Sequence, residues 1–260
     1  MMGFARTSSI GVSLVMLTSA LGAQATPFLF SVTPSAGQSK SAAAYGYYEL
    51  GYGERTFEPV AGDRLEQAIG VRATIGSSLM LLARTGVSTV GNDTRVSPRG
   101  EVLYSRSVGS SVRIAGGVGY AREYSRTDVM LARFGVGRTT SRSLINGNLM
   151  LEKPMSGERD AVDLITTIGA GRKLGSSVTL SVEAVGQDLE GFWDAAERDG
   201  GARLMAGPTI AIAPPAARWQ LTVGGGPILR ATRSNFASAA DRPLPARNGY
   251  VLRSAVGFNW

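Results

Sequence analysis

Hydrophobic residues recur at every second position through most of the chain from residue 43 onward. The stretch RLEQAIGVRATIG shows the pattern, because Leu65, Ile69 and Val71 share one face and Glu66 and Arg72 the other. A period of two is that of a β-strand with one apolar and one wetter face, whereas a helix needs spacings of three and four. The chain is therefore predicted to be all-β.

Turn-forming residues separate these alternating segments, and we predict about twelve strands. The predicted strands span residues 43–54, 63–75, 79–90, 99–108, 112–123, 128–138, 143–153, 160–173, 178–188, 201–213, 218–231 and 248–260. An even number of antiparallel strands places both ends of the set on the same side of the sheet.

The connections between the predicted strands alternate in length. The tripeptide GSS begins at Gly76, Gly109 and Gly175; the first two are 33 residues apart and the third follows after twice that interval. A further short turn is expected near residue 142, where TTSR stands. The other connections are longer and carry more charge. Short turns on one side and long polar loops on the other are typical of an outer-membrane β-barrel.

The N-terminal part of the chain has a different character. The first 25 residues combine Arg6 with an apolar run at 10–21 and a small-residue cleavage pattern, which predicts a cleaved secretory signal peptide over 1–25. An uncleaved anchor helix is the alternative, but the apolar run is short for one. Residues 26–42, rich in Pro, Ser and Ala, are predicted to be a periplasmic leader or linker, and 43–260 the barrel.

The chain closes on NGYVLRSAVGFNW, where an aromatic residue ends a strand with hydrophobic residues at alternate positions before it: Trp260, Phe258, Val256, Leu252 and Tyr250. This ending resembles the C-terminal signature of Gram-negative outer-membrane β-barrel proteins. The resemblance covers about residues 43–260 as a pattern and names no subfamily. It implies an outer-membrane location, contact with outer-membrane lipid, and a last strand that the barrel-assembly machinery recognises before it closes against the first strand.

We therefore expect a transmembrane antiparallel up-and-down β-barrel of about twelve strands. Aromatic residues near the strand ends predict two girdles at the membrane interfaces. The predicted girdle residues are Tyr52, Tyr120, Tyr124 and Tyr250 at the long-loop rim and Trp219, Phe258 and Trp260 at the short-turn rim. The alternative is a secreted β-sandwich, which shows the same periodicity. The signal segment, the even count, the long strands and the terminal Trp favour the barrel.

Composition excludes several kinds of function. The 260 residues contain no cysteine, so a disulfide scaffold and a thiolate metal site are excluded. Histidine, the usual general base near neutral pH, is also absent. A Ser–Lys or carboxylate mechanism is the remaining catalytic alternative, but no acid–base cluster stands out, and we predict no enzyme, metal site or cofactor. The net charge is +7, but an exported protein is not expected to encounter nucleic acid, so we predict no nucleic-acid binding.

The arginines predict a basic lumen. An arginine that faces lipid at mid-membrane costs about 2–4 kcal/mol, so arginines within the strands are expected to face inward. The residues predicted to line the lumen and set its selectivity are Arg72, Arg84, Arg113, Arg133, Arg203, Arg230 and Arg253, with Glu66, Asp163 and Glu183. A basic lumen favours anions. We expect a narrow, passive, porin-like channel for small anionic solutes.

Two alternatives stay open. The inward arginines and carboxylates could pair with one another and brace a closed interior, because buried charges need partners. The barrel could then be non-conducting and have a structural, adhesive or partner-docking role through its long extracellular loops.

Overall fold

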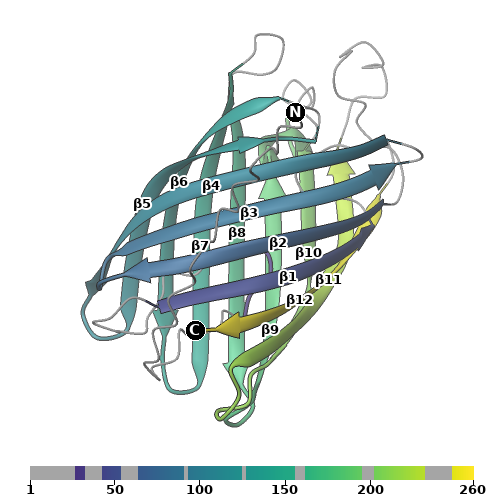
Figure 1. Cartoon of the computed structure of the whole chain (residues 1–260). Helices are drawn as coiled ribbons and strands as arrows, with labels where there is room; N and C mark the ends of the chain where they lie inside the picture. The colour runs from purple at the N-terminus through teal and green to yellow at the C-terminus, as the bar shows by residue number, and fades with distance from the viewer. Residues whose placement is uncertain are drawn as a thin grey trace, which may run out of the picture.

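The computed structural model describes residues 27–32, 43–53, 64–90, 93–124, 127–155, 162–194, 202–231 and 248–260. Twelve antiparallel strands form a closed barrel in which each strand pairs with its neighbours in sequence and the first pairs with the last (Figure 1). This confirms the predicted fold. The predicted signal peptide lies outside the described residues, and among those described no helix has the length and apolarity that crossing a membrane requires.

The strands are β1 (Ala43–Gly53), β2 (Arg64–Ile75), β3 (Leu79–Val90), β4 (Asp93–Val108), β5 (Val112–Arg122), β6 (Asp128–Thr139), β7 (Ser143–Pro154), β8 (Asp163–Lys173), β9 (Val178–Gln187), β10 (Ala202–Ile212), β11 (Trp219–Ala231) and β12 (Gly249–Asn259). A short 3-10 helix, η1 (Leu189–Phe192), follows β9. Every predicted strand is present, and only one predicted boundary is far from the observed one.

That boundary is the start of β4, which lies at Asp93 rather than residue 99. The turn-like letters and Pro98 in this stretch predicted a loop, and the prediction was wrong. Pairing between β4 and β3 runs from Asp93, whereas pairing between β4 and β5 begins only at Arg99. Pro98 therefore lies where the strand has one neighbour, and a proline without an N–H is tolerated at such an edge.

The short turns follow their predicted chemistry. Gly76, Gly109 and Gly175 have positive φ angles of 63°, 68° and 107°, which glycine adopts without steric cost. The expected turn near residue 142 uses a side chain instead. Thr140 Oγ1 accepts hydrogen bonds from the backbone N–H of Arg142 at 3.3 Å and of Ser143 at 2.9 Å. Both solutions connect neighbouring strands tightly on the same side of the barrel.

The terminal Trp260 takes part in closing the barrel. Strands β1 and β12 pair from Tyr45 opposite Asn259 to Gly53 opposite Val251. The backbone N–H of Trp260 donates to the carbonyl of Ala44 at 3.0 Å. Its indole covers Gly46, where a Cβ atom would lie 2.3 Å from the ring. The last strand thus closes against the first, as the resemblance implied; its recognition by the assembly machinery stays a prediction.

The two faces of the sheet differ as the alternation predicts. Large apolar side chains point outward and are exposed, among them Ile69 at 64%, Val118 at 63% and Ile168 at 58%. An exposed apolar surface that extends around the barrel suits lipid rather than water. Inside, one residue from each of β7 to β12 contributes to an apolar cluster: Met150, Ile165, Val185, Met205, Ile228 and Val251. We call this set the apolar cluster.

Most of the predicted girdle residues are exposed. Tyr52, Tyr120, Tyr250, Trp219, Phe258 and Trp260 are between 41% and 57% exposed. Tyr124 is the exception, because it is 2% exposed and its hydroxyl donates to Glu66 inside the barrel at 3.1 Å. Its assignment to the girdle was wrong. Strand β5 ends at Arg122, so the alternation that would turn residue 124 outward no longer applies after that residue.

Candidate functional site in the barrel lumen

The barrel encloses a piece of its own N-terminal chain, residues 27–32, which we call the lumen segment. Phe28 is 4% exposed, and its ring lies against Gly169 of β8, where a Cβ atom would come within 2.7 Å. Phe30 packs on the apolar cluster, and the guanidinium of Arg253 lies over its ring at 5.0 Å from the centroid. The predicted leader is thus described only at 27–32, and that part lies in the lumen.

One buried carboxylate holds the lumen segment. Oε2 of Glu183 accepts the backbone N–H of Leu29 at 2.9 Å, and Oε1 accepts that of Phe30 at 3.0 Å. Oε1 also accepts the hydroxyl of Ser31 at 3.4 Å, while Oε2 accepts that of Thr209 in β10 at 2.7 Å. Glu183 is 0% exposed. Hydrogen bonds to a charged acceptor are among the stronger ones in proteins, so this contact fixes the segment against β9 and β10.

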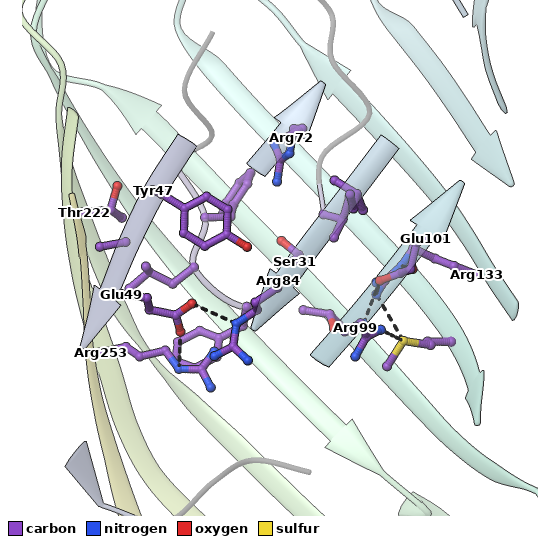
Figure 2. Close-up of a pocket in the computed structure, with 18 of the residues that line it drawn as sticks. Ser31, Tyr47, Glu49, Arg72, Arg84, Arg99, Glu101, Arg133, Thr222 and Arg253 are labelled. Carbon is purple, nitrogen blue, oxygen red and sulfur yellow. Dashed lines mark hydrogen bonds and ion pairs between the residues drawn. The ribbon is translucent and has the colours of Figure 1, made fainter. Parts of the chain in front are cut away.

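A cavity of about 210 Å³ lies between the lumen segment and the barrel wall (Figure 2). Its charged lining residues are Arg72, Arg84, Arg99, Arg133 and Arg253, with Glu49 and Glu101. Two tyrosines of β1, Tyr45 and Tyr47, also line it. Positive groups therefore outnumber negative ones around the cavity.

The two carboxylates are each shared between two arginines. Glu49 lies 3.3 Å from Nε of Arg84 through Oε2 and 3.0 Å from Nε of Arg253 through Oε1. Figure 2 shows Glu49 between these two guanidinium groups. Each buried carboxylate is thereby paired, and Glu66 at 2.7 Å from Arg84 and Glu152 at 3.9 Å from Arg99 add further negative charge beside the lining arginines. The paired charges therefore brace the lumen.

The second cluster is centred on Glu101 of β4. Its Oε1 lies 2.8 Å from Nε of Arg99, and its Oε2 lies 2.7 Å from Nε of Arg133. Nη2 of Arg133 also donates to Oε1 at 3.0 Å, so the Arg133 contact is bidentate. Bidentate arginine–carboxylate pairs fix geometry as well as charge. Both side chains are therefore held in place on the wall.

Arg72 of β2 differs from these four arginines. Within the part of the chain that the structure describes, its guanidinium makes no hydrogen bond or ion pair, and its Nε is buried without an acceptor. It stands opposite Tyr45 in the register of β1 and β2. Tyr45 and Tyr47 stack with ring centroids 5.9 Å apart. An unpaired cation thus faces the cavity beside two phenol rings.

The cavity brings together only part of the predicted set. Arg72, Arg84, Arg133 and Arg253 line it; the other predicted lumen residues lie inside the barrel but are not part of the lining. Those are Arg113, Arg203, Arg230, Glu66, Asp163 and Glu183. Several of them are separated from the cavity because they lie near strand ends: Arg203 and Arg230, for example, face each other near the long-loop end of the barrel.

The remaining predicted residues have structural partners. Arg113 donates to Ser105 Oγ at 3.1 Å and to the carbonyl of Ser77 near the short turns. Arg203 donates to Gln187 at 2.5 Å. Glu66 lies 2.7 Å from Nη2 of Arg84. The Arg113 and Arg203 contacts brace the interior towards its two ends, and the Glu66 contact does so beside the cavity.

The sequence prediction missed several cavity residues: Arg99, Glu49, Glu101, Tyr45 and Tyr47. Arg99 and Glu101 fell at the wrongly predicted start of β4. Continuing the alternation backward from the inward Leu103 would have found both, because Glu101 and Arg99 occupy the same row. The lumen segment had no signal of this kind.

No protein-family model and no curated protein sequence matches the chain. Among solved structures, the chain is similar to the NanC porin at 8% identity, with a TM-score of 0.60 over 82% of this chain and 98% of that one. The KdgM porin has the same identity and coverage, with a TM-score of 0.56. The fold is that of an outer-membrane β-barrel.

A third structure of this fold is an outer-membrane channel from Pseudomonas putida F1. It is 9% identical, with a TM-score of 0.53 over 91% of this chain and all of that one. These three relatives in fold are porins and channels rather than enzymes. At such identities the likeness is one of architecture, and the solute has to be argued from the lumen itself.

Proposed function

We propose that the chain forms a narrow, passive channel of the outer membrane that passes small anionic solutes. The observation that carries the proposal is the cavity inside the closed barrel, which is lined by five arginines and two glutamates. A lumen with a positive excess and low-dielectric walls concentrates anions and repels cations. The exposed apolar outer face and the likeness to porins support the outer-membrane location.

The lumen segment limits the size of the solute. It packs on the apolar cluster and lines, together with the arginines, a cavity of about 210 Å³. Pockets for drug-sized ligands usually measure about 300–1,000 Å³. The proposed solutes are therefore small, with room for one or a few functional groups at a time.

The occupied lumen is also the observation that favours the alternative. A barrel filled by its own chain and by arginine–carboxylate clusters could serve as a non-conducting scaffold that acts through its long loops. Two of these loops, at 54–63 and 232–247, lie outside the described residues. Conductance separates the two functions, because the scaffold needs no ion path.

The test is planar-bilayer recording from the purified, folded chain in a KCl gradient. We expect discrete conductance steps and a reversal potential that shows anion preference. Arg253→Gln should shift the reversal potential towards cations. Arg106→Gln, which removes the same charge from an exposed position, should leave it unchanged. Absence of current from folded protein would eliminate the channel, and cation preference would eliminate its proposed selectivity.

A further inference from the structure

The unpaired state of Arg72 sets it apart from the other arginines of the cavity. Arg84, Arg99, Arg133 and Arg253 each contact a carboxylate at 3.3 Å or less. Arg72 contacts none among the described residues, although its Nε is buried. Burying a charged group without a partner costs free energy, so native proteins rarely keep one without a use. A ligand that enters the cavity would supply the missing acceptor.

Tyr47 provides a second polar group at the same place. Its ring and hydroxyl lie over Gly70, where a Cβ atom would be 2.4 Å from the hydroxyl oxygen. Gly70 precedes Arg72 by two residues on the inward face of β2, so the Tyr47 hydroxyl lies over the same inward row of β2 that carries Arg72 (Figure 2). Like Arg72, Tyr47 makes no hydrogen bond through its side chain to another described residue. Glycine at position 70 is what permits this approach.

The two tyrosine rings give the site an apolar side. Tyr45 stacks on Tyr47 with an interplanar angle of 24°, and its own ring lies over Gly257 of β12. Phe30 of the lumen segment also lines the cavity. Stacked rings bury carbon and favour flat or apolar groups. The site therefore combines a cation and a hydroxyl with an aromatic surface.

We propose that Arg72 and Tyr47 bind the carboxylate of a small organic anion whose carbon part rests on Tyr45. The inference deepens the proposed channel function, on which it rests, by naming the site where such a solute would stop in the lumen. A guanidinium presents two parallel N–H donors to a carboxylate, and the tyrosine hydroxyl adds a third. The cavity of about 210 Å³ admits a single small molecule rather than a chain of linked units.

Benzoate is a suitable probe, with benzamide as its neutral counterpart of the same shape. Binding is measured by isothermal titration calorimetry on the full chain, folded in detergent, in low-chloride buffer. We expect benzoate to bind one per barrel and benzamide not to bind measurably. Arg72→Gln should weaken benzoate binding about ten-fold or more, and Tyr47→Phe by a smaller factor.

Two further variants control for charge and folding. Arg72→Lys keeps the charge and should restore part of the affinity that Arg72→Gln loses. Arg106→Gln removes an equal charge from the exposed outer face and should bind benzoate as the parent does. Each variant is checked for folding by its heat-modifiable electrophoretic mobility. Unchanged affinity in Arg72→Gln, or equal binding of benzamide, would overturn the proposed site.

The binding measurement is independent of ion flow. Benzoate binding that depends on Arg72, in a barrel that carries no current, would support the site and overturn the channel. Anion-selective current without such binding would support the channel and overturn the site. The two proposals can therefore fail separately.

Discussion

Replacing Glu183 by glutamine should release the lumen segment while keeping the size of the side chain. Two donors contact each carboxylate oxygen: Leu29 N–H and Thr209 at Oε2, and Phe30 N–H and Ser31 at Oε1. Glutamine offers one acceptor oxygen, and its amide nitrogen is itself a donor. In either orientation, one backbone N–H of the segment then faces another donor. The remaining bonds also lose the charge of the acceptor.

The size of the effect follows from these contacts. Losing one hydrogen bond to a charged group costs about 1.5–3 kcal/mol, and the loss of charge at the remaining oxygen adds about 1 kcal/mol. Docking of the segment is therefore weakened by about 2.5–4 kcal/mol, which raises its undocked population about 70- to 900-fold.

A single thiol reports this population, because the chain contains no cysteine. Ser31 is 4% exposed, so a Ser31→Cys variant should react slowly with a maleimide in the folded barrel. Adding Glu183→Gln should accelerate labelling in proportion to the increase in the undocked population of the lumen segment. Adding Glu101→Gln, which removes a buried carboxylate bonded to arginines instead of the segment, should not. Equal labelling rates with and without Glu183→Gln would refute the docking argument.

Two further substitutions test the packing of the interior. Tyr124→Phe should destabilise the barrel by about 1–3 kcal/mol in urea unfolding, because a buried hydrogen bond to Glu66 is lost, whereas Tyr120→Phe, at an exposed hydroxyl, should cost less. No difference between the two would contradict this. Gly169→Ala should lower stability by about 1–3 kcal/mol, because its methyl group meets the phenyl ring of the lumen segment at 2.7 Å, while Gly147→Ala meets its nearest atom at 3.6 Å and should be tolerated. Equal thermal unfolding of the two glycine variants would count against a packed segment.

Most of the fold could be predicted because each strand of a membrane barrel carries its own signal. The period of two in β2 and the glycines at the turns are local features, and the terminal Trp260 marks the closing strand. The failures have local causes too. Pro98 indicated a loop where the strand has only one neighbour, and Tyr124 followed the alternation past the end of β5.

The site was less predictable because it depends on contacts between distant residues. Glu183 and Leu29 are separated by 154 positions, and no pattern at either residue reveals the other. The alternation predicted correctly that Arg72 and Arg84 face inward, yet it could not show that only Arg84 has a carboxylate beside it. That distinction comes from strand register and from the direction of each side chain.

The division of the lumen has a consequence for how a molecule would move through it. At the level of the cavity, arginines project from β2, β3, β4, β6 and β12, while the apolar cluster spans β7 to β12. A passing solute with a charged group and an apolar group would meet both kinds of lining side by side, because Met150 of the apolar cluster lies within hydrogen-bond distance of Arg99 and Arg133. Such a lumen would select a solute by its combination of charged and apolar groups as well as by its width, and a solute with charged groups alone would leave the apolar lining without a contact.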